Sequence, residues 1–167
     1  MVTGGSALRG TVAVRGAKNA VLKHLVACLL APGRHRIENV PDILDVDVMC
    51  RVLAHIGAGT RREEGALEVE VPEDLLPEAP ISLVRQMRAS ILVLGSLLAR
   101  CGLARVALPG GDDFGSRPID MHIAGFQDMG ARFELSHGVL LASAPDGLHG
   151  AEVYLEFPSV GATENLL

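Results

Sequence analysis

Hydrophobic positions along the chain follow two kinds of helical pattern. Segments 19–31 and 87–99 are apolar nearly all the way round, which predicts helices buried on all sides. Segments 47–56 and 118–129 are amphipathic instead, with an apolar stripe opposite charged residues such as Asp47. The pattern therefore predicts two helices inside the molecule and two that face solvent on one side.

Other segments alternate between polar and apolar residues, as a strand with one solvated face does. The alternation is clear at 11–15 and 67–71, and further strands or hairpins are expected before Pro41, before Pro109 and within 131–143. Buried helices with half-exposed sheets outside them predict an α/β fold that is not doubly wound. No GxGxxG or GxxxxGK[ST] motif follows a predicted strand, which disfavours the nucleotide-binding folds that carry them.

The plan of apolar helix, strand, helix and hairpin occurs twice. The two copies are 68 residues apart at Leu29 and Leu97, but 73 apart at Gly57 and Gly130. The second copy thus holds five more residues, which we place in the loop at 110–117, and an insertion in one repeat often marks the functional face. A third copy begins at Gly161, so we divide the chain into repeats at about 16–83 and 84–157 and the start of a third at 158–167.

Composition narrows the class of protein. The chain has 167 residues, of which 49% are hydrophobic and only 3% aromatic, so the core is aliphatic. A net charge of −5 argues against nucleic acid as the main partner. Three widely spaced cysteines favour neither a metal site nor disulfides, and indicate a reducing compartment. Since no leader sequence or membrane-length apolar run occurs, we expect a cytoplasmic protein without membrane contact.

The loop at 110–120 combines glycines, carboxylates and an arginine. Gly110, Gly111 and Gly115 allow a backbone to approach a ligand closely, and Pro118 is placed to open a helix. An acid beside an anion-binding arginine suggests a lid that closes over a phosphorylated substrate. On local grounds alone, the two aspartates could equally be a turn pair.

Three segments carry polar residues at the starts of predicted buried helices: Lys18-Asn19, Arg88, and the turn from Ser159 to Thr163, which follows a predicted strand end at Pro158. Helix N-termini attract anions, so their convergence would suit a nucleoside diphosphate together with a second phosphorylated substrate. The plainer alternatives are a solvated lysine, a structural ion pair of Arg88, and a Ser/Thr helix cap. We expect His122 to be a helix-surface histidine.

Together these motifs resemble the UDP-N-acetylglucosamine 1-carboxyvinyltransferase family of enolpyruvyl transferases. The resemblance covers essentially the whole chain and rests on Gly16-Ala17-Lys18-Asn19-Ala20, Met87-Arg88-Ala89-Ser90, Leu108-Pro109-Gly110-Gly111, Gly115-Ser116-Arg117-Pro118-Ile119-Asp120-Met121-His122 and Ser159-Val160-Gly161-Ala162-Thr163. It implies an inside-out α/β barrel of three repeats, of which this chain holds about two. It also implies a C-terminal domain that is missing here, against which residues 1–15 would pack as a strand.

The resemblance also assigns roles to residues. Lys18 and Asn19 would contact phosphoenolpyruvate, and Arg88 would help to bind substrate. Segment 117–121 would line the uridine site, and segment 159–161 would hold the diphosphate. Asp112 would donate a proton to phosphoenolpyruvate, with Lys18 and Arg117 as the other catalytic residues. The site residues implied are Lys18, Asn19, Arg88, Asp112, Arg117, Pro118, Ile119, Asp120, Met121, Ser159, Val160 and Gly161.

One departure from the family bears on its chemistry. Most members have cysteine where this chain has Asp112, and only a thiolate is a good nucleophile. We therefore expect resistance to fosfomycin, which alkylates that cysteine. The resemblance implies no metal and no cofactor. Two alternatives stay open: an enolpyruvyl transferase acting on another nucleotide, and a ligand-binding remnant without activity, in which exposed apolar surface could drive self-association.

Overall fold

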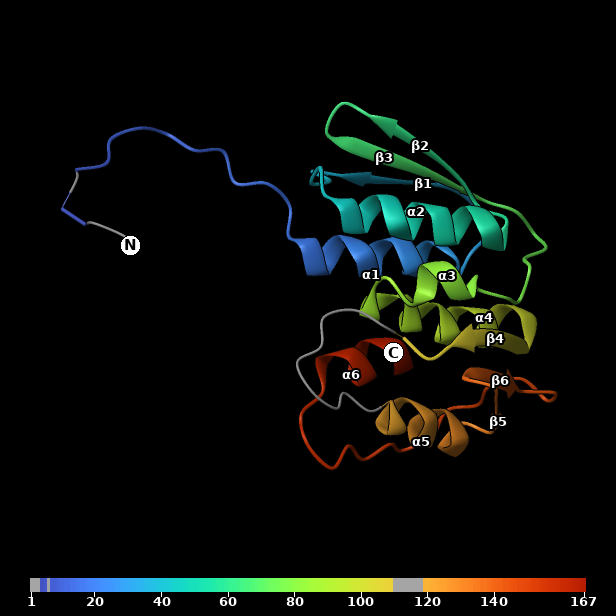
Figure 1. The fold of residues 1–167 in the computed structure, drawn as a ribbon. Helices are drawn as coiled ribbons and strands as arrows, with labels where there is room; N and C mark the ends of the chain where they lie inside the picture. The colour runs from blue at the N-terminus through green and yellow to red at the C-terminus, as the bar shows by residue number, and fades with distance from the viewer. Residues whose placement is uncertain (1–3, 6, 110–118) are drawn as a thin grey trace.

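A computed structural model of the chain describes residues 4–5, 7–109 and 119–167, and shows two similar halves stacked on each other (Figure 1). The first half contains α1 (Lys18–Cys28), β1 (Gly33–Glu38), α2 (Leu44–Ile56), β2 (Gly59–Glu63) and β3 (Ala66–Val71). The second half contains α3 (Ile81–Val84), the 3-10 helix η1 (Arg88–Leu92), α4 (Val93–Cys101), β4 (Leu103–Ala107), α5 (Asp120–Asp128), β5 (Arg132–Ser136) and β6 (Val139–Ser143). Helix α6 (Val160–Leu166) follows.

Each half has one three-stranded antiparallel sheet with the same strand order. The order is β1-β3-β2 in the first and β4-β6-β5 in the second. Both sheets end in a hairpin, and the β5–β6 turn at His137 and Gly138 uses two positive φ values of 51° and 77°, as a tight two-residue turn requires. The predicted α/β fold of repeated units is confirmed, and no barrel closes among the described residues.

The buried helices differ from each other in a way that the sequence did not predict. Helix α4 is enclosed as expected, with every residue from Val93 to Leu98 buried. Helix α1 is not, because α2 and the first sheet cover one side and η1–α4 another, which leaves a strip at His24, Ala27 and Leu30 exposed. Burial on all sides was therefore the wrong prediction for α1.

Helices α1, α4 and α6 run in parallel, and α4 contacts each of the other two (Figure 1). Ser96 Oγ on α4 donates to the Val26 carbonyl on α1 at 3.2 Å. The Gly95 N–H donates to Asn165 Oδ1 on α6 at 3.3 Å. Each of these pairs is 70 residues apart in sequence. As a result, α1, η1–α4 and α6 begin on the same side of the molecule, the left-hand side of Figure 1.

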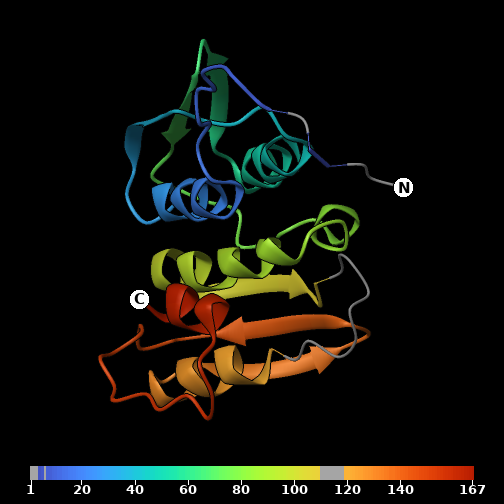
Figure 2. The same cartoon turned by 90° about the vertical axis from the view of Figure 1, so that its left-hand side faces the viewer.

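An arginine fastens the two halves together. Arg100, near the end of α4, donates from Nη1 to the Leu29 carbonyl and from Nη2 to the Glu73 carbonyl, both at 2.8 Å. Carbonyls at the end of a helix lack intrahelical partners, so Arg100 satisfies one that α1 leaves open. Figure 2 shows the result, with α1 stacked on η1–α4 and α6 on the other side of α4.

Two predicted strands are not formed. Residues 11–15 are not in a strand, and Val12 and Val14 are 85% and 89% exposed. The strand that we expected to end at Pro158 is also absent, since residues 151–158 lie outside any strand. By contrast, the linker before α3 pairs with β4, since Arg105 N donates to Pro77 O at 2.8 Å. Alternation alone does not form a strand without a neighbouring edge, and no described strand supplies one to these segments.

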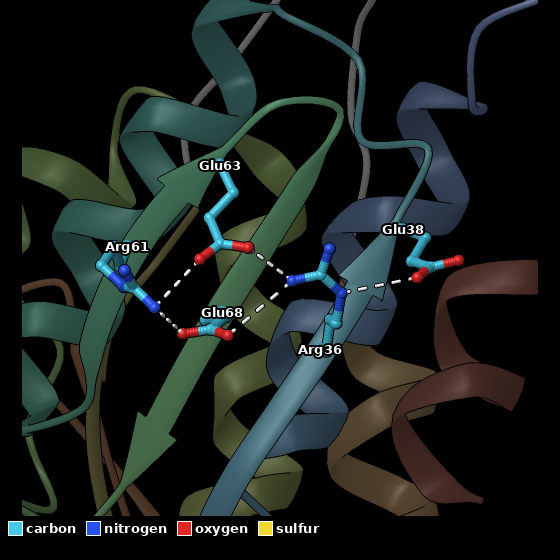
Figure 3. Close-up of polar contacts among 5 residues, drawn as sticks. All are labelled: Arg36, Glu38, Arg61, Glu63 and Glu68. Carbon is cyan, nitrogen blue, oxygen red and sulfur yellow. Dashed lines mark hydrogen bonds and ion pairs between the residues drawn. The ribbon is translucent and has the colours of Figure 1, made fainter.

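The outer face of the first sheet carries interlinked ion pairs (Figure 3). Arg61 contacts Glu63 and Glu68 at 2.9 and 2.6 Å, and Arg36 contacts Glu63 at 2.5 Å. Hydrogen bonding from Arg61 holds the pKa of Glu68 below its ordinary value. The opposite face of β3 buries Leu67, Val69 and Val71. One solvated sheet face is what the alternation at 67–71 predicted.

Candidate active site

Lys18 is the first residue of α1, and its side chain forms an ion pair. Lys18 Nζ lies 2.6 Å from Asp45 Oδ2 in the first turn of α2, and the two side chains are 58% and 29% exposed. Asn19 follows it and is exposed. Lys18 is therefore neither a lysine surrounded only by solvent nor a buried one: it is held at the surface by a carboxylate that the sequence analysis did not single out.

The second helix start is Arg88, which is half-buried and opens η1 where the sequence predicted a helix to begin. Its charge is one of the causes that lower the pKa of His122 on α5. The start of η1 and the first turn of α5 are 32 residues apart in sequence. They lie near each other in space, because Asn165 contacts both Ile91 and His122.

The third start belongs to α6. Ser159 is its N-cap, and Ser159 Oγ accepts a hydrogen bond from Ala162 N at 3.3 Å. The capping role left open in the sequence analysis is thus present. It uses one of the first N–H groups of the helix, while Val160 is 69% exposed beside it. A cap of this kind holds the turn at 159–161 in a fixed shape.

His122 is buried, so the prediction of a helix-surface histidine was wrong. It lies four residues before Phe126, on the face of α5 that enters the core, and is only 4% exposed. Asn165 Nδ2 lies 3.0 Å from His122 Nδ1. Burial, followed by the charge of Arg88, lowers the pKa of His122 and so favours the uncharged imidazole.

Backbone contacts fix the orientation of the Asn165 side chain. Its Oδ1 accepts from Gly95 N, and its Nδ2 also lies 3.4 Å from the Ile91 carbonyl, so the nitrogen end is identified. His122 Nδ1 must therefore accept, and the proton is on Nε2, which faces the α6 turn near Gly161. Asn165 thus links the η1–α4 junction, α5 and α6.

The remaining predicted site residues are divided between described and undescribed parts of the chain. Ile119 is buried in the core, Asp120 begins α5 and is exposed, and Met121 is half-buried. The predictions for Asp112, Arg117 and Pro118 lie outside the described residues. The structure therefore gathers 119–121, Arg88 and the 159–161 turn around His122, with Lys18 and Asn19 on the neighbouring helix start.

A cavity of about 230 Å³ lies elsewhere, between α1, α4, α5 and α6. Its lining is mostly apolar and extends toward the ends of these helices, at Leu30, Ala99, Met129 and Leu167. It does not include Lys18, Arg88 or Ser159, so it is not the predicted anion site. Within the described ranges, no group of three or more His, Cys, Asp or Glu side chains is arranged to hold a metal ion.

Comparison with known proteins decides the family. The family model described as EPSP synthase (3-phosphoshikimate 1-carboxyvinyltransferase) matches residues 2–167. The chain belongs to the EPSP synthase family. Solved structures of enolpyruvyl transferases and EPSP synthases resemble its fold. The enolpyruvyl transferase NikO from Streptomyces tendae matches with a TM-score of 0.72 and 25% identity, over 85% of this chain and 31% of NikO.

An EPSP synthase from Acinetobacter baumannii shares the fold, with a TM-score of 0.74 and 16% identity over 95% of this chain and 37% of that one. In sequence this chain is more similar to proteins named UDP-N-acetylglucosamine 1-carboxyvinyltransferase than to that EPSP synthase. Those from Mycolicibacterium paratuberculosis and Corynebacterium jeikeium are 53% and 49% identical over all 167 residues. The chain spans about 40% of the length of these relatives.

None of the helices in the described part of this chain is both long enough and apolar enough to cross a membrane. Its three cysteines are free, and burial raises the pKa of each thiol, so none of them has thiolate character at neutral pH.

Three residues that lie beside predicted site residues were not recognised from the sequence: Asp45, His122 and Asn165. Each could be recognised only by a weak signal. Asp45 belongs to an Asp-rich segment, and His122 has the spacing of the buried stripe with Phe126. Asn165 follows Ala162 by one helical turn on a helix that the repeat predicts to be buried.

Proposed function

We propose that this chain is the N-terminal part of an enzyme that transfers enolpyruvyl from phosphoenolpyruvate to the 3-hydroxyl of UDP-N-acetylglucosamine. The observation that carries the proposal is identity of about 50% along the whole chain to relatives with that name. The reaction would supply a peptidoglycan precursor in the cytoplasm. It would take place between this part of the protein and the longer remainder that the relatives carry.

The arrangement of helix starts supports the proposal. A nucleoside diphosphate and an enol phosphate are both polyanions, and Arg88 and the 159–161 turn lie on the same side of the molecule as Lys18. Lys18 and Asn19 would bind phosphoenolpyruvate, Arg88 would bind at the substrate cleft, and Ser159, Val160 and Gly161 would hold the diphosphate. Arg117, Pro118, Ile119, Asp120 and Met121 would line the uridine site.

The proposed reaction is an addition followed by an elimination. The sugar 3-oxygen bonds to C2 of phosphoenolpyruvate and loses its proton to a base, while C3 gains a proton. Loss of phosphate from C2 and of a proton from C3 then restores the double bond. Asp112 would donate the proton to C3, and Lys18 and Arg117 would stabilise the phosphate charge. The aspartate would do so without the covalent adduct that a thiolate could form.

A second candidate is an enolpyruvyl transferase with another nucleotide as acceptor. The likeness to NikO, an enolpyruvyl transferase, favours keeping it. The shikimate-pathway sister enzyme fits less well, because it would carry Gly-Asp-Lys-Ser where this chain has Gly16-Ala17-Lys18-Asn19.

A panel of acceptors separates these functions. The test protein is the complete enzyme, meaning a protein of family length that contains residues 1–167. We expect phosphate release from phosphoenolpyruvate only when UDP-N-acetylglucosamine is present, and not with shikimate 3-phosphate or a nucleotide that lacks the sugar. Residues 1–167 alone should show negligible turnover, because the remainder of the family's site is absent from them. Release with a different acceptor would overturn the assignment.

A further inference from the structure

Three carboxylates lie around the start of α2, and they form ion pairs with two different basic residues. Arg62 on β2 reaches two of them, with Nη1 2.8 Å from Asp42 Oδ1 and Nη2 2.9 Å from Asp47 Oδ1. The third, Asp45, contacts Lys18 instead, at 2.6 Å. Asp45 is also the least exposed of the three, at 29% against 90% and 58% for Asp42 and Asp47. Asp45 is therefore the one of these three carboxylates that pairs with Lys18.

Asp45 is attached to a rigid element, whereas Lys18 has a flexible side chain. Val46 and Met49 follow Asp45 on α2 by one and four residues. Both are completely buried and hold the first turn of the helix in place. The lysine side chain has four rotatable bonds and would otherwise sample many positions. Its ammonium has three N–H donors, so contact with Asp45 leaves donors for another anion. Fixing the ammonium beforehand reduces the entropy lost on binding.

We propose that Asp45 is a positioning residue that holds the Lys18 ammonium at the start of α1, ready for the anion that Lys18 binds. The identity of that anion, the enol phosphate substrate, rests on the proposed function, whereas the ion pair does not. Asp45 does not touch substrate in this proposal. It acts through Lys18 by fixing where the remaining N–H donors lie.

The chain offers a simple test because it contains only two lysines. The other, Lys23, lies 2.5 Å from Glu164 on α6 and serves as an internal reference. Trace acetylation with acetic anhydride, followed by peptide mass spectrometry, gives the ratio of the two labelling rates. Acetylation requires an amine that the reagent can reach, so a nitrogen held against a carboxylate reacts more slowly than one that is free to move. The measurement works on residues 1–167 and needs no enzymatic activity.

We expect Asp45→Asn to accelerate labelling of Lys18 about two- to five-fold relative to Lys23, which is the scale of a partly exposed ion pair. Asp45→Glu should give a smaller increase, because it keeps the charge. Asp47→Asn is the matched control and should change nothing, since Asp47 contacts Arg62. Circular dichroism should be the same for all four proteins. An unchanged ratio with Asp45→Asn, or an equal change with Asp47→Asn, would overturn the proposal.

Kinetics of the complete enzyme test the positioning role itself. Asp45→Asn should raise KM for phosphoenolpyruvate several-fold and leave KM for the sugar nucleotide within about two-fold, with partial recovery in Asp45→Glu. An equal rise in both KM values would indicate a merely structural role and contradict the proposal. If the unmodified complete enzyme transfers no enolpyruvyl group, the proposed function fails while the labelling result still decides whether Asp45 holds Lys18.

Discussion

Replacing Asp112 with asparagine in the complete enzyme is expected to lower kcat by about 10²- to 10⁴-fold, the usual contribution of a general acid. The amide has nearly the same shape as the carboxyl group but cannot deliver a proton to C3 of phosphoenolpyruvate. Asp113→Asn is the matched control, because Asp113 has no assigned role, and its kcat should stay within a few-fold of the native value. Phosphate release at saturating substrates measures both. Equal losses in the two variants would show that Asp112 is not the acid.

Replacing the same residue with cysteine should keep the activity but make the enzyme sensitive to fosfomycin. A thiol can also carry the proton, so Asp112→Cys should retain turnover, but its thiolate can be alkylated by fosfomycin. The native complete enzyme should keep its activity after incubation with fosfomycin, while Asp112→Cys loses it in a stoichiometric reaction. Mass spectrometry then shows whether the adduct is on residue 112. Rapid inactivation of the native enzyme would contradict the proposed role of Asp112.

The largest effect on stability is expected at Phe126. Phe126 on α5 is 1% exposed and belongs to a hydrophobic core that joins both halves. Its ring approaches α4 closely, since a Cβ added to Gly95 would lie 2.9 Å from Phe126 Cζ. Phe126→Ala would leave a cavity between α4 and α5 and should lower the free energy of unfolding by about 3–5 kcal/mol.

Phe157→Ala supplies the control for Phe126→Ala. Phe157 precedes α6 and is 55% exposed, so the same substitution there should change the free energy of unfolding by less than about 0.5 kcal/mol. Urea denaturation of residues 1–167, followed by far-UV circular dichroism, gives both values. Similar losses in the two variants would mean that α5 does not pack against α4 as the structure shows.

The parts of the fold that could be predicted are those marked in the sequence by the repeat or by a local periodicity. Helix α2, the hairpins and the enclosed α4 were predicted because each has a pattern set by its own side chains. The exposed strip of α1 and the missing strands at 11–15 and 151–158 were not, because whether an apolar side chain is covered depends on a neighbour that the local pattern does not specify. Val14 has the alternation of a strand residue, yet no described edge accepts it.

The same limit applies to the site. Sequence placed Lys18, Arg88 and Ser159 at helix starts, which the structure confirms, because caps and apolar runs mark helix boundaries locally. The sequence did not predict which side chains contact one another in this region. The Lys18–Asp45 pair, and the contact of His122 with Asn165, join residues that are far apart in sequence and meet only when the helices pack.

Hydrogen exchange of the complete enzyme with and without UDP-N-acetylglucosamine tests most directly whether these helix starts form one substrate site. Peptides that cover Arg88–Leu92, Asp120–Asp128 and Val160–Leu166 should exchange more slowly with the ligand, because their first turns would hold the uridine and the diphosphate. The outward strand β2, at Gly59–Glu63, should be unaffected. Protection that spares both η1 and α6, or that is confined to the peptides around Leu30 and Ala99, would contradict the proposed site.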